Sequence, residues 1–232
     1  MLLFLHGFLG QKEDWDLLFS QLPVPARAID LPGHGGSPMA GDIALAIREQ
    51  VPKATCVVGY SAGGRVALEL KERFPSDYGS LVLLSTHLGL TSKEERMERQ
   101  EKDAKWIHLL NTRPFEEFLE KWYAQELFAS FRNSPHFLAA LSRRKKQAPH
   151  LLAQFMNQYS IASKKPSKVP EGTILVYGEW DLKYERLYRK LGRIETTHVI
   201  KNAGHAVHLE NPASCSKVIY EHYRNCKSPL LA

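Results

Sequence analysis

Short apolar runs recur along the chain, and each is followed by a glycine-rich turn or an amphipathic segment. The runs span residues 2–5, 26–30, 55–60, 80–85, 173–178 and 197–201. Hydrophobic and polar positions do not alternate within them, which is typical of strands buried on both faces, as in a parallel sheet covered by helices. Helical spacing of apolar positions occurs between or after these runs, at residues 14–22, 62–74 and 211–225. This order predicts an α/β fold, with a mostly parallel sheet of about six strands and helices on both faces.

The interval between the fourth and fifth runs breaks this rhythm, because it is helical and charged throughout. Ser92, followed three residues later by Glu95, forms a capping box that should open a helix ending near Leu110. Further helical segments are expected over 114–127 and 134–160. A helical block between two strands is typical of a lid, so the predicted domains are a core of residues 1–87 and 171–232 and a helical cap of residues 88–170.

Composition and length fit one soluble globular core. The chain has 232 residues, 44% of them hydrophobic and 24% charged, and no apolar stretch approaches the roughly 20 residues of a membrane-spanning helix. Its start, MLLFLHGFLG, lacks the basic segment and cleavage site of a secretory signal. Cys56, Cys215 and Cys226 are an odd number without metal-ligand spacing, which favours free thiols in the cytoplasm. We therefore expect no membrane partner and no metal site.

The net charge of +6 is distributed unevenly. Residues 127–170 contain eight Lys or Arg residues and no Asp or Glu. Such a segment is as compatible with RNA as with an acidic small molecule, although RNA binding would also need a basic stripe with stacking aromatic residues. The catalytic motifs favour a small anionic ligand, so we expect no nucleic-acid partner. The oligomeric state is not indicated.

The segment Gly59-Tyr60-Ser61-Ala62-Gly63 has the pattern G-x-S-x-G, at the end of a buried strand and the start of a helix. That context is the one a nucleophile elbow requires, with the serine on a tight turn that exposes its hydroxyl. A glycine-rich turn with an idle serine is the alternative. The pattern favours Ser61 as the reactive group.

A serine hydroxyl becomes reactive when a histidine takes its proton and an acid orients that histidine. Asp181 follows the strand in TILVYGEWD, and His205 lies in the loop after the next strand, in THVIKNAGHAVH. Both positions suit a triad in the chain order Ser, Asp, His. Glu179 is a second candidate acid and His208 a second candidate histidine, but the Ala-Gly-His context favours His205.

An oxyanion hole needs two backbone N–H donors aimed at the developing charge. One is expected from Ala62, the residue after the nucleophile. The other is expected from Phe8, in the loop after the first strand. His6 in the same loop is interpreted as a bracing residue and not as a catalyst.

These motifs resemble those of the α/β-hydrolase superfamily over nearly the whole chain, since HGF, DLPGHG, GYSAGG, GEWD and AGH occur in the expected order. More narrowly, the chain resembles the 2-succinyl-6-hydroxy-2,4-cyclohexadiene-1-carboxylate synthase family of menaquinone biosynthesis. The narrower likeness depends on FLHGFLG, DLPGHGGS, VGYSAGGRVAL, ERMERQEKDAKW, WYAQELFAS, the arginine in LSRRKK, and AGHAVHLENP.

The resemblance implies an α/β-hydrolase fold and a carbon–oxygen lyase that uses no metal or cofactor. Its substrate would be a polycarboxylate, 2-succinyl-5-enolpyruvyl-6-hydroxy-3-cyclohexene-1-carboxylate, from which it would eliminate pyruvate. Ser61 would act as the base that removes a ring proton, activated by His205 and Asp181. The oxyanion hole and nearby cations would stabilise the negative charge that develops.

Arg65 supports a charged substrate on physical grounds alone. It lies four residues after Ser61 on the elbow helix, so the two side chains share a face. A hydrolase of apolar esters would gain nothing from a desolvated charge there, whereas an arginine can bind a carboxylate with two hydrogen bonds. The alternative is a structural ion pair with Glu69, one turn further on.

Other candidate substrate contacts have a structural alternative beside the functional one. By resemblance, Arg99 and Arg143 would bind substrate carboxylates, but Arg99 could instead pair with Asp103, and Arg144 could be the arginine that turns inward. Tyr60 and Lys183 flank the serine and the acid, and we expect both to contact substrate. Trp122 and Tyr123 fit either a cap wall facing the substrate ring or ordinary cap core.

Two further questions stay open in the sequence. A carboxylesterase or thioesterase acting on a small acidic acyl substrate would use the same triad, with serine as a true nucleophile, and a non-catalytic ligand-binding relative is a more remote alternative. The chain also begins almost at its first strand. That leaves open whether this strand lies at an edge of the sheet, where it could support dimerisation.

Overall fold

A six-stranded, all-parallel sheet forms the centre of the molecule. The computed structural model describes residues 1–192 and 196–227, and the strand order is β2-β1-β3-β4-β5-β6. The strands are β1 (Leu2–Leu5), β2 (Ala26–Ile29), β3 (Ala54–Tyr60), β4 (Tyr78–Leu84), β5 (Ile174–Gly178) and β6 (Thr197–Ile200). Every pairing is parallel. The predicted fold class is therefore confirmed.

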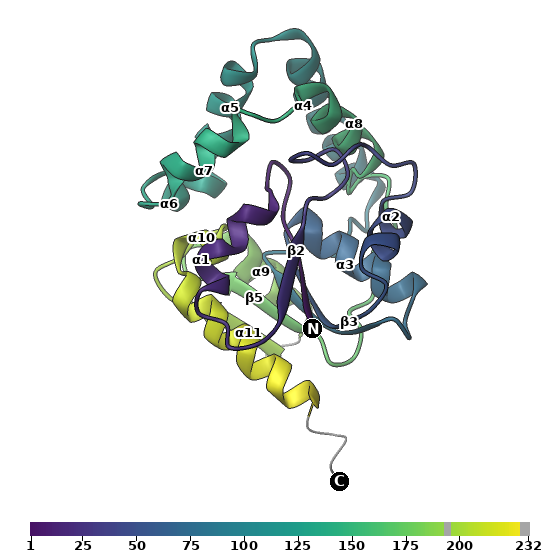
Figure 1. Cartoon of the computed structure of the whole chain (residues 1–232). Helices are drawn as coiled ribbons and strands as arrows, with labels where there is room; N and C mark the ends of the chain where they lie inside the picture. Colours follow the sequence, from purple (N-terminus) through teal and green to yellow (C-terminus); the bar gives the residue numbers. More distant parts are fainter. Residues whose placement is uncertain (193–195, 228–232) are drawn as a thin grey trace.

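Helices cover both faces of the sheet, which is why the strands are apolar without alternation. Along β1, Leu2 and Phe4 belong to one buried cluster and Leu3 and Leu5 to the other. The first cluster includes residues of α1 (Asp16–Phe19) and α11 (Pro212–Lys227), and the second includes residues of α2 (Ile43–Gln50), α3 (Ala62–Arg73) and α9 (Leu182–Lys190). Figure 1 shows α1 and α11 on the opposite side of the strands from α2 and α3.

The first strand lies inside the sheet and not at its edge, so a role for it in edge-to-edge dimerisation is ruled out. β1 pairs with β2 on one side, where Leu2 aligns with Ala26, and with β3 on the other, where Leu2 aligns with Cys56. The chain runs outward from β1 to β2 and then returns to the far side of β1. The strand order therefore reverses between β1 and β3, and ligands of parallel sheets bind beyond the carboxyl ends of the strands at such a point.

The segment between β4 and β5 is a stack of helices over the carboxyl ends of the strands (Figure 1). It contains α4 (Lys93–Thr112), α5 (Phe115–Ala124), the 3-10 turn η2 (Glu126–Phe128), α6 (Ala129–Arg132), α7 (Phe137–Arg144) and α8 (Pro149–Gln158). The expected capping box is present, since Ser92 Oγ accepts from Glu95 N–H and a Glu95 carboxylate oxygen accepts from Ser92 N–H. The limits 88–170 of the cap stay a prediction.

The helical segment expected over 134–160 is two helices and not one. α7 ends at Arg144, and α8 starts with Pro149 as its first residue. Proline cannot donate a backbone hydrogen bond within a helix but suits the first helical turn, so the helix has to restart there. The intervening residues, 145–148, form a short link that returns to the core.

In the described parts of the chain, no helix is both long enough and apolar enough to span a bilayer.

Candidate active site

Ser61 occupies a strained turn between β3 and α3. Its φ of 50° and ψ of −107° lie in a region that residues other than glycine rarely adopt. Close packing around the turn requires glycine on both sides: a Cβ on Gly63 would lie 2.3 Å from the Leu5 carbonyl oxygen, and one on Gly59 would lie 2.5 Å from the Gly64 Cα. The flanking glycines thus let the elbow sit against β1 and its own helix. Ser61 lines the cavity described below.

Asp181 and His205 form a buried pair beside the elbow. His205 Nδ1 lies 2.8 Å from Asp181 Oδ2, and the aspartate is only 4% exposed. The other carboxylate oxygen, Oδ1, accepts a hydrogen bond from Tyr184 N–H at 3.3 Å and caps α9. Asp181 therefore caps a helix and contacts the histidine at the same time. Because Asp181 accepts at Nδ1, it leaves Nε2 of His205 as the nitrogen available to take a proton.

The loop that carries His205 is held by a carboxylate that the sequence interpretation did not single out. Glu210, on the short helix α10 (Val207–Glu210), accepts hydrogen bonds from Gly204 N–H and Ala206 N–H, each at 2.9 Å. These two amides flank His205 directly. Glutamate five residues after the histidine is the only sequence signal for this brace.

Glu179 and His208, the alternative acid and histidine, are not part of the Asp181–His205 pair. Glu179 pairs with Lys201 at 2.8 Å and accepts from Asn202 N–H, whereas the carboxylate that contacts His205 is that of Asp181. His208 is fully buried, its ring lies 4.4 Å from those of Trp15 and Tyr60, and neither ring nitrogen has a hydrogen-bond partner among the described residues. Burial lowers the pKa of His208 to about 3, so this histidine stays neutral.

Two parts of the catalytic arrangement stay predictions. Within residues 1–192 and 196–227, no hydrogen bond joins the Ser61 hydroxyl to His205, although both line the same cavity. Such contacts are often long in ligand-free enzymes and shorten when substrate binds. Phe8 and Ala62 also line the cavity. They are the residues from which the two oxyanion donors were expected.

A cavity of about 420 Å³ opens between the cap and the carboxyl ends of the strands. Its core wall comes from the loops after β1 and β3, at the reversal of strand order. The predicted site residues that line it are Phe8, Tyr60, Ser61, Ala62, Arg65, Arg99, Trp122, Tyr123, Lys183 and His205. Asp181 lies behind His205, and Arg143 is not part of the lining. The cap aromatic Trp122 packs edge-on against Phe8 at 5.0 Å between ring centroids, which closes the apolar side of the cavity.

Arg65 lines this cavity, and no carboxylate pairs with it within the described ranges 1–192 and 196–227. Its Nε is buried and unpaired, and its Nη2 lies 3.4 Å from the Tyr159 carbonyl oxygen, the limit for a weak hydrogen bond. Glu69, the alternative partner, is bound instead by Arg73, Lys164 and the Tyr159 hydroxyl, at distances of 2.7–3.1 Å. Burial, and then the charge of Arg99, lower the pKa of the Arg65 guanidinium. A structural ion pair therefore does not explain Arg65.

Other positive charges gather on the same side of the cavity. Arg99 lines it while its Nε donates to Asp103 at 2.7 Å, so the ion pair considered as an alternative is present. Burial, and then Arg99, lower the pKa of Lys183, and burial together with Lys183 and Arg65 lowers the pKa of His87 to about 4. The positive charges of Arg65, Arg99 and Lys183 thus lie close enough to disfavour one another. Such a region favours the binding of negative charge.

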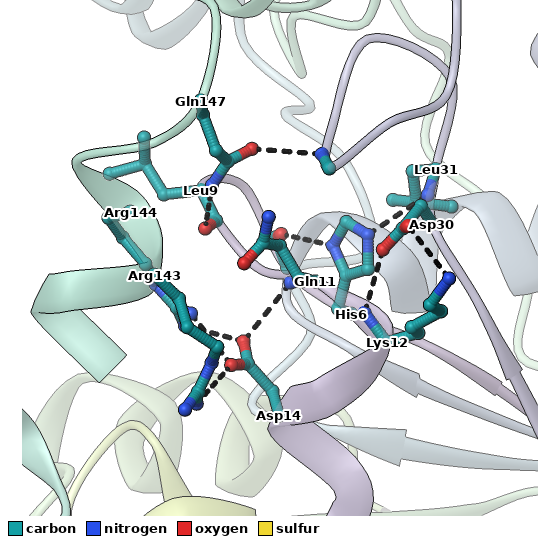
Figure 2. A network of polar contacts seen from close by, with 12 residues as sticks. His6, Leu9, Gln11, Lys12, Asp14, Asp30, Leu31, Arg143, Arg144 and Gln147 are labelled. Atoms are coloured by element: carbon teal, nitrogen blue, oxygen red, sulfur yellow. Dashed lines mark hydrogen bonds and ion pairs between the residues drawn. The ribbon is translucent and has the colours of Figure 1, made fainter. Parts of the chain in front are cut away.

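Arg143 was expected to bind a substrate carboxylate, but its side chain pairs with Asp14 and is not part of the cavity lining. Arg144, and not Arg143, lines the cavity, and it binds both carboxylate oxygens of Asp14 (Figure 2). Arg143 also donates to Asp14 Oδ1, at 2.8 Å. Burial opposes ionisation of Asp14, but the two guanidinium groups hold the pKa of its carboxyl well below the ordinary value. This cluster joins the cap helix α7 to the core turn η1 (Lys12–Trp15).

Some residues of the cavity wall were not foreseen. Lys102 lies three residues after Arg99 on α4, so helical spacing could have indicated it. His87 follows the end of β4, where ligands of parallel sheets bind, and this position is a weaker signal. The exposed Glu95 and Glu98 also lie on the α4 side of the cavity, so its rim carries both signs of charge.

Comparison with known proteins agrees with this geometry. Residues 2–218 match the alpha/beta hydrolase family. The chain is 32% identical over 231 residues to a 2-succinyl-6-hydroxy-2,4-cyclohexadiene-1-carboxylate synthase from Enterobacter sp. (strain 638), covering 92% of this chain and 87% of that protein. The chain belongs to the alpha/beta hydrolase family, among the 2-succinyl-6-hydroxy-2,4-cyclohexadiene-1-carboxylate synthases.

Solved structures share the fold of this chain. MenH from S. aureus superposes with a TM-score of 0.87 at 25% identity, over 98% of this chain and 94% of that one. A thermophilic esterase from Thermogutta terrifontis, solved with malate bound, superposes with a TM-score of 0.75 at 21% identity, over 98% of this chain and 90% of that one. The second likeness concerns the fold alone, and it shows that the fold does not by itself distinguish elimination from ester hydrolysis.

Proposed function

We propose that this protein eliminates pyruvate from 2-succinyl-5-enolpyruvyl-6-hydroxy-3-cyclohexene-1-carboxylate and releases 2-succinyl-6-hydroxy-2,4-cyclohexadiene-1-carboxylate. The observation that carries the proposal is Arg65, which has no carboxylate partner among residues 1–192 and 196–227 and lies one helical turn from Ser61 in the cavity. A buried guanidinium without a counter-ion is unfavourable in the empty protein, and a substrate carboxylate would supply that counter-ion. The names of the sequence relatives support this substrate class.

In the proposed reaction, Ser61 is a general base and forms no covalent bond to substrate. Nε2 of His205 takes the Ser61 proton, and Asp181 stabilises the imidazolium that results, through the 2.8 Å contact at Nδ1. The serine oxygen removes the ring proton at C2, and the electron pair left behind forms the C2–C3 double bond. The existing C3–C4 double bond shifts to C4–C5 as the bond from C5 to the enolpyruvyl oxygen breaks. The enolate that leaves is protonated on carbon to give pyruvate.

The charges in the cavity suit a substrate with carboxylates around a small ring. Arg65, Arg99 and Lys183 would bind carboxylates on the α4 and α9 side. The carbon ring would lie against Trp122 and Tyr123 on the cap. The Phe8 and Ala62 N–H groups would stabilise the charge that develops when the ring proton leaves, as oxyanion donors do in acyl transfer.

The test is pyruvate release from the enolpyruvyl substrate, followed through NADH oxidation by coupled lactate dehydrogenase. Wild-type protein should release pyruvate, Ser61→Ala should lose this activity by at least about 10³-fold, and Ser163→Ala should retain it, because Ser163 lies outside the cavity. A p-nitrophenyl ester of a small dicarboxylic acid serves as the second substrate. Hydrolysis of that ester with an acylated Ser61 in the mass spectrum, and no pyruvate release, would replace this proposal with the esterase alternative.

We also propose a cytoplasmic location. Cys56, Cys215 and Cys226 are all free thiols in the structure, and the first two are buried. Free thiols are the usual state in a reducing compartment. Alkylation of the three thiols in protein taken directly from lysed cells, without added reductant, tests this placement.

A further inference from the structure

Gln147 connects the cap to two loops of the core. It lies in the link between α7 and α8, and its side chain is buried, with 5% of the residue exposed. Its Nε2 donates to the Leu9 carbonyl oxygen at 2.6 Å, and its Oε1 accepts from Gly35 N–H at 3.2 Å (Figure 2). A carbonyl can only accept and a backbone N–H can only donate, so these partners define which way the amide points.

The contact at Leu9 leads to the predicted oxyanion donor through two peptide units. The Leu9 carbonyl and the Gly10 N–H belong to one peptide group, and this N–H donates to the Gly7 carbonyl oxygen at 2.9 Å. The Gly7 carbonyl in turn shares its peptide group with the Phe8 N–H. In a planar trans peptide the C=O and N–H point in opposite directions, so holding each carbonyl also aims the N–H behind it. Hydrogen bonds in such a chain also polarise one another.

The turn formed by these residues needs support from outside. Leu9, its third residue, has a φ of 66°, a position that usually requires glycine and that costs a branched side chain about 1–3 kcal/mol. His6 provides one support, because its Nδ1 contacts the Gly7 carbonyl oxygen at 2.8 Å while its Nε2 accepts from Leu31 N–H at 2.9 Å. The Leu31 contact requires the proton to be on Nδ1. Gln147 is the support that the cap provides.

We propose that Gln147 is a positioning residue for the oxyanion hole: through the Leu9-Gly10 and Gly7-Phe8 peptide groups it aims the Phe8 N–H beside Ser61. The cap then does more than cover the substrate, because it completes the catalytic geometry of the core. This inference rests on the oxyanion role given to Phe8 under the proposed function. It applies equally to elimination and to ester hydrolysis, since both develop negative charge at that site.

The experiment compares Gln147→Met and Gln147→Glu with Gln158→Met. Gln158 is a matched control, because it also donates from the cap to a core carbonyl, that of Gly41 at 2.7 Å, but lies on the surface and outside the cavity. Gln147→Met removes both contacts with little change of volume. Gln147→Glu keeps an acceptor for Gly35 N–H and, when ionised, has no proton for the Leu9 carbonyl. It therefore tests the Leu9 contact alone, and it serves as the second variant if the methionine variant does not fold.

For both Gln147 variants, we expect kcat for pyruvate release to fall by about 10- to 100-fold, less than the 10²- to 10³-fold that follows loss of a whole oxyanion donor. KM should change by less than about threefold, and Gln158→Met should match wild type in both quantities. Exchange of the Gly10 amide with solvent, measured by residue-resolved mass spectrometry, should accelerate in the Gln147 variants only. A merely structural role for Gln147 would lower thermal stability without this split between kcat and KM.

Failure of this inference can be told apart from failure of the proposed function. If wild type releases no pyruvate, the proposed function fails, and the rate at which a fluorophosphonate labels Ser61 takes the place of kcat, since phosphonylation uses the same oxyanion hole. The inference itself is overturned if the Gln147 variants stay within twofold of Gln158→Met in kcat or labelling rate. It is equally overturned if Gly10 exchange is unchanged.

Discussion

Replacing Arg65 with methionine should change stability and activity in opposite directions. The methionine keeps an unbranched apolar stem in the same space but removes the guanidinium. In the part of the chain that the structure describes, its buried Nε has no hydrogen-bond partner and its Nη2 has one weak contact with the Tyr159 carbonyl oxygen. Its Cζ also lies 6.0 Å from the centroid of the Tyr159 ring. Its pKa is lowered by burial and by Arg99, so the folded, empty protein holds this charge at a disadvantage.

The size of both effects follows from these contacts. Replacing a buried ion pair with apolar side chains is often neutral or raises stability by about 1–4 kcal/mol. Arg65 leaves no counter-ion behind among the described residues, so we expect Arg65→Met to raise the free energy of unfolding by about 1–2 kcal/mol. For activity, one hydrogen bond to a charged group contributes about 1.5–3 kcal/mol. Two bonds to a substrate carboxylate therefore correspond to about 10²- to 10⁴-fold in kcat/KM.

The assay combines urea unfolding at pH 7 with the coupled pyruvate assay. Arg73→Met is the control on the same helix: Arg73 is exposed, lies outside the cavity and pairs with Asp42 at 2.7 Å and Glu69 at 3.1 Å. That variant should lose up to about 1 kcal/mol of stability and keep its activity. The reasoning is wrong if Arg65→Met is folded and as active as wild type on the anionic substrate. It is also wrong if the variant is destabilised by several kcal/mol, since Arg65 would then have a structural partner.

Three further substitutions test separate parts of the structure. Gly63→Ala should destabilise the protein by at least about 3 kcal/mol or prevent folding, because its Cβ would lie 2.3 Å from the Leu5 carbonyl oxygen. Thermal unfolding measures this loss of stability. A loss of under about 1 kcal/mol would contradict the packing described. Asp181→Asn should reduce kcat by about 10³- to 10⁴-fold with the fold intact, because an amide at the 2.8 Å contact favours the wrong histidine tautomer; near-normal turnover would return attention to another acid. His208→Phe should flatten the pH dependence of stability. Burial lowers the pKa of His208 to about 3. Below pH 6.5, the ordinary pKa of histidine, the unfolded chain therefore binds a proton at this residue and the folded chain does not. For this one group, the free energy of unfolding falls by about 1.4 kcal/mol per pH unit as the pH drops from about 6.5 towards 3. Urea unfolding at pH 7, 6, 5 and 4 should show a shallower slope for His208→Phe than for wild type, and identical slopes would mean that His208 is protonated in the fold.

The sequence predicted the strands and the tight turn at Ser61 well, because both depend on neighbours along the chain. Apolar runs without alternation predicted a covered parallel sheet, and the glycines around Ser61 predicted a tight turn. The position of β1 could not be predicted in this way, because strand order depends on crossovers that local pattern does not record. Helical periodicity likewise did not show that Pro149 starts a new helix.

The contacts of the cap are the part that sequence reasoning could not resolve. Asp14 meets Arg143 and Arg144 across 129 and 130 residues, and Gln147 meets Leu9 across 138. Adjacent arginines in a basic run look alike in sequence, and only the turn of α7 decides which one enters the cavity. A buried glutamine in a short link leaves no pattern at all.

Some residues of this site suit several reactions, whereas the cations without an ion-pair partner suit a particular kind of substrate. The strained serine, the buried Asp181 and the loop carrying Phe8 suit any reaction in which negative charge develops beside the elbow, and the fold is shared with an esterase. Arg144 is neutralised by Asp14 and Arg99 by Asp103, so neither needs a ligand to be stable. Among the described residues, Arg65 and Lys183 line the same cavity without an ion-pair partner. Since unpaired cations held close together are unfavourable until an anion binds, we expect these two residues, and not the triad, to select a substrate that carries carboxylates near the reacting carbon.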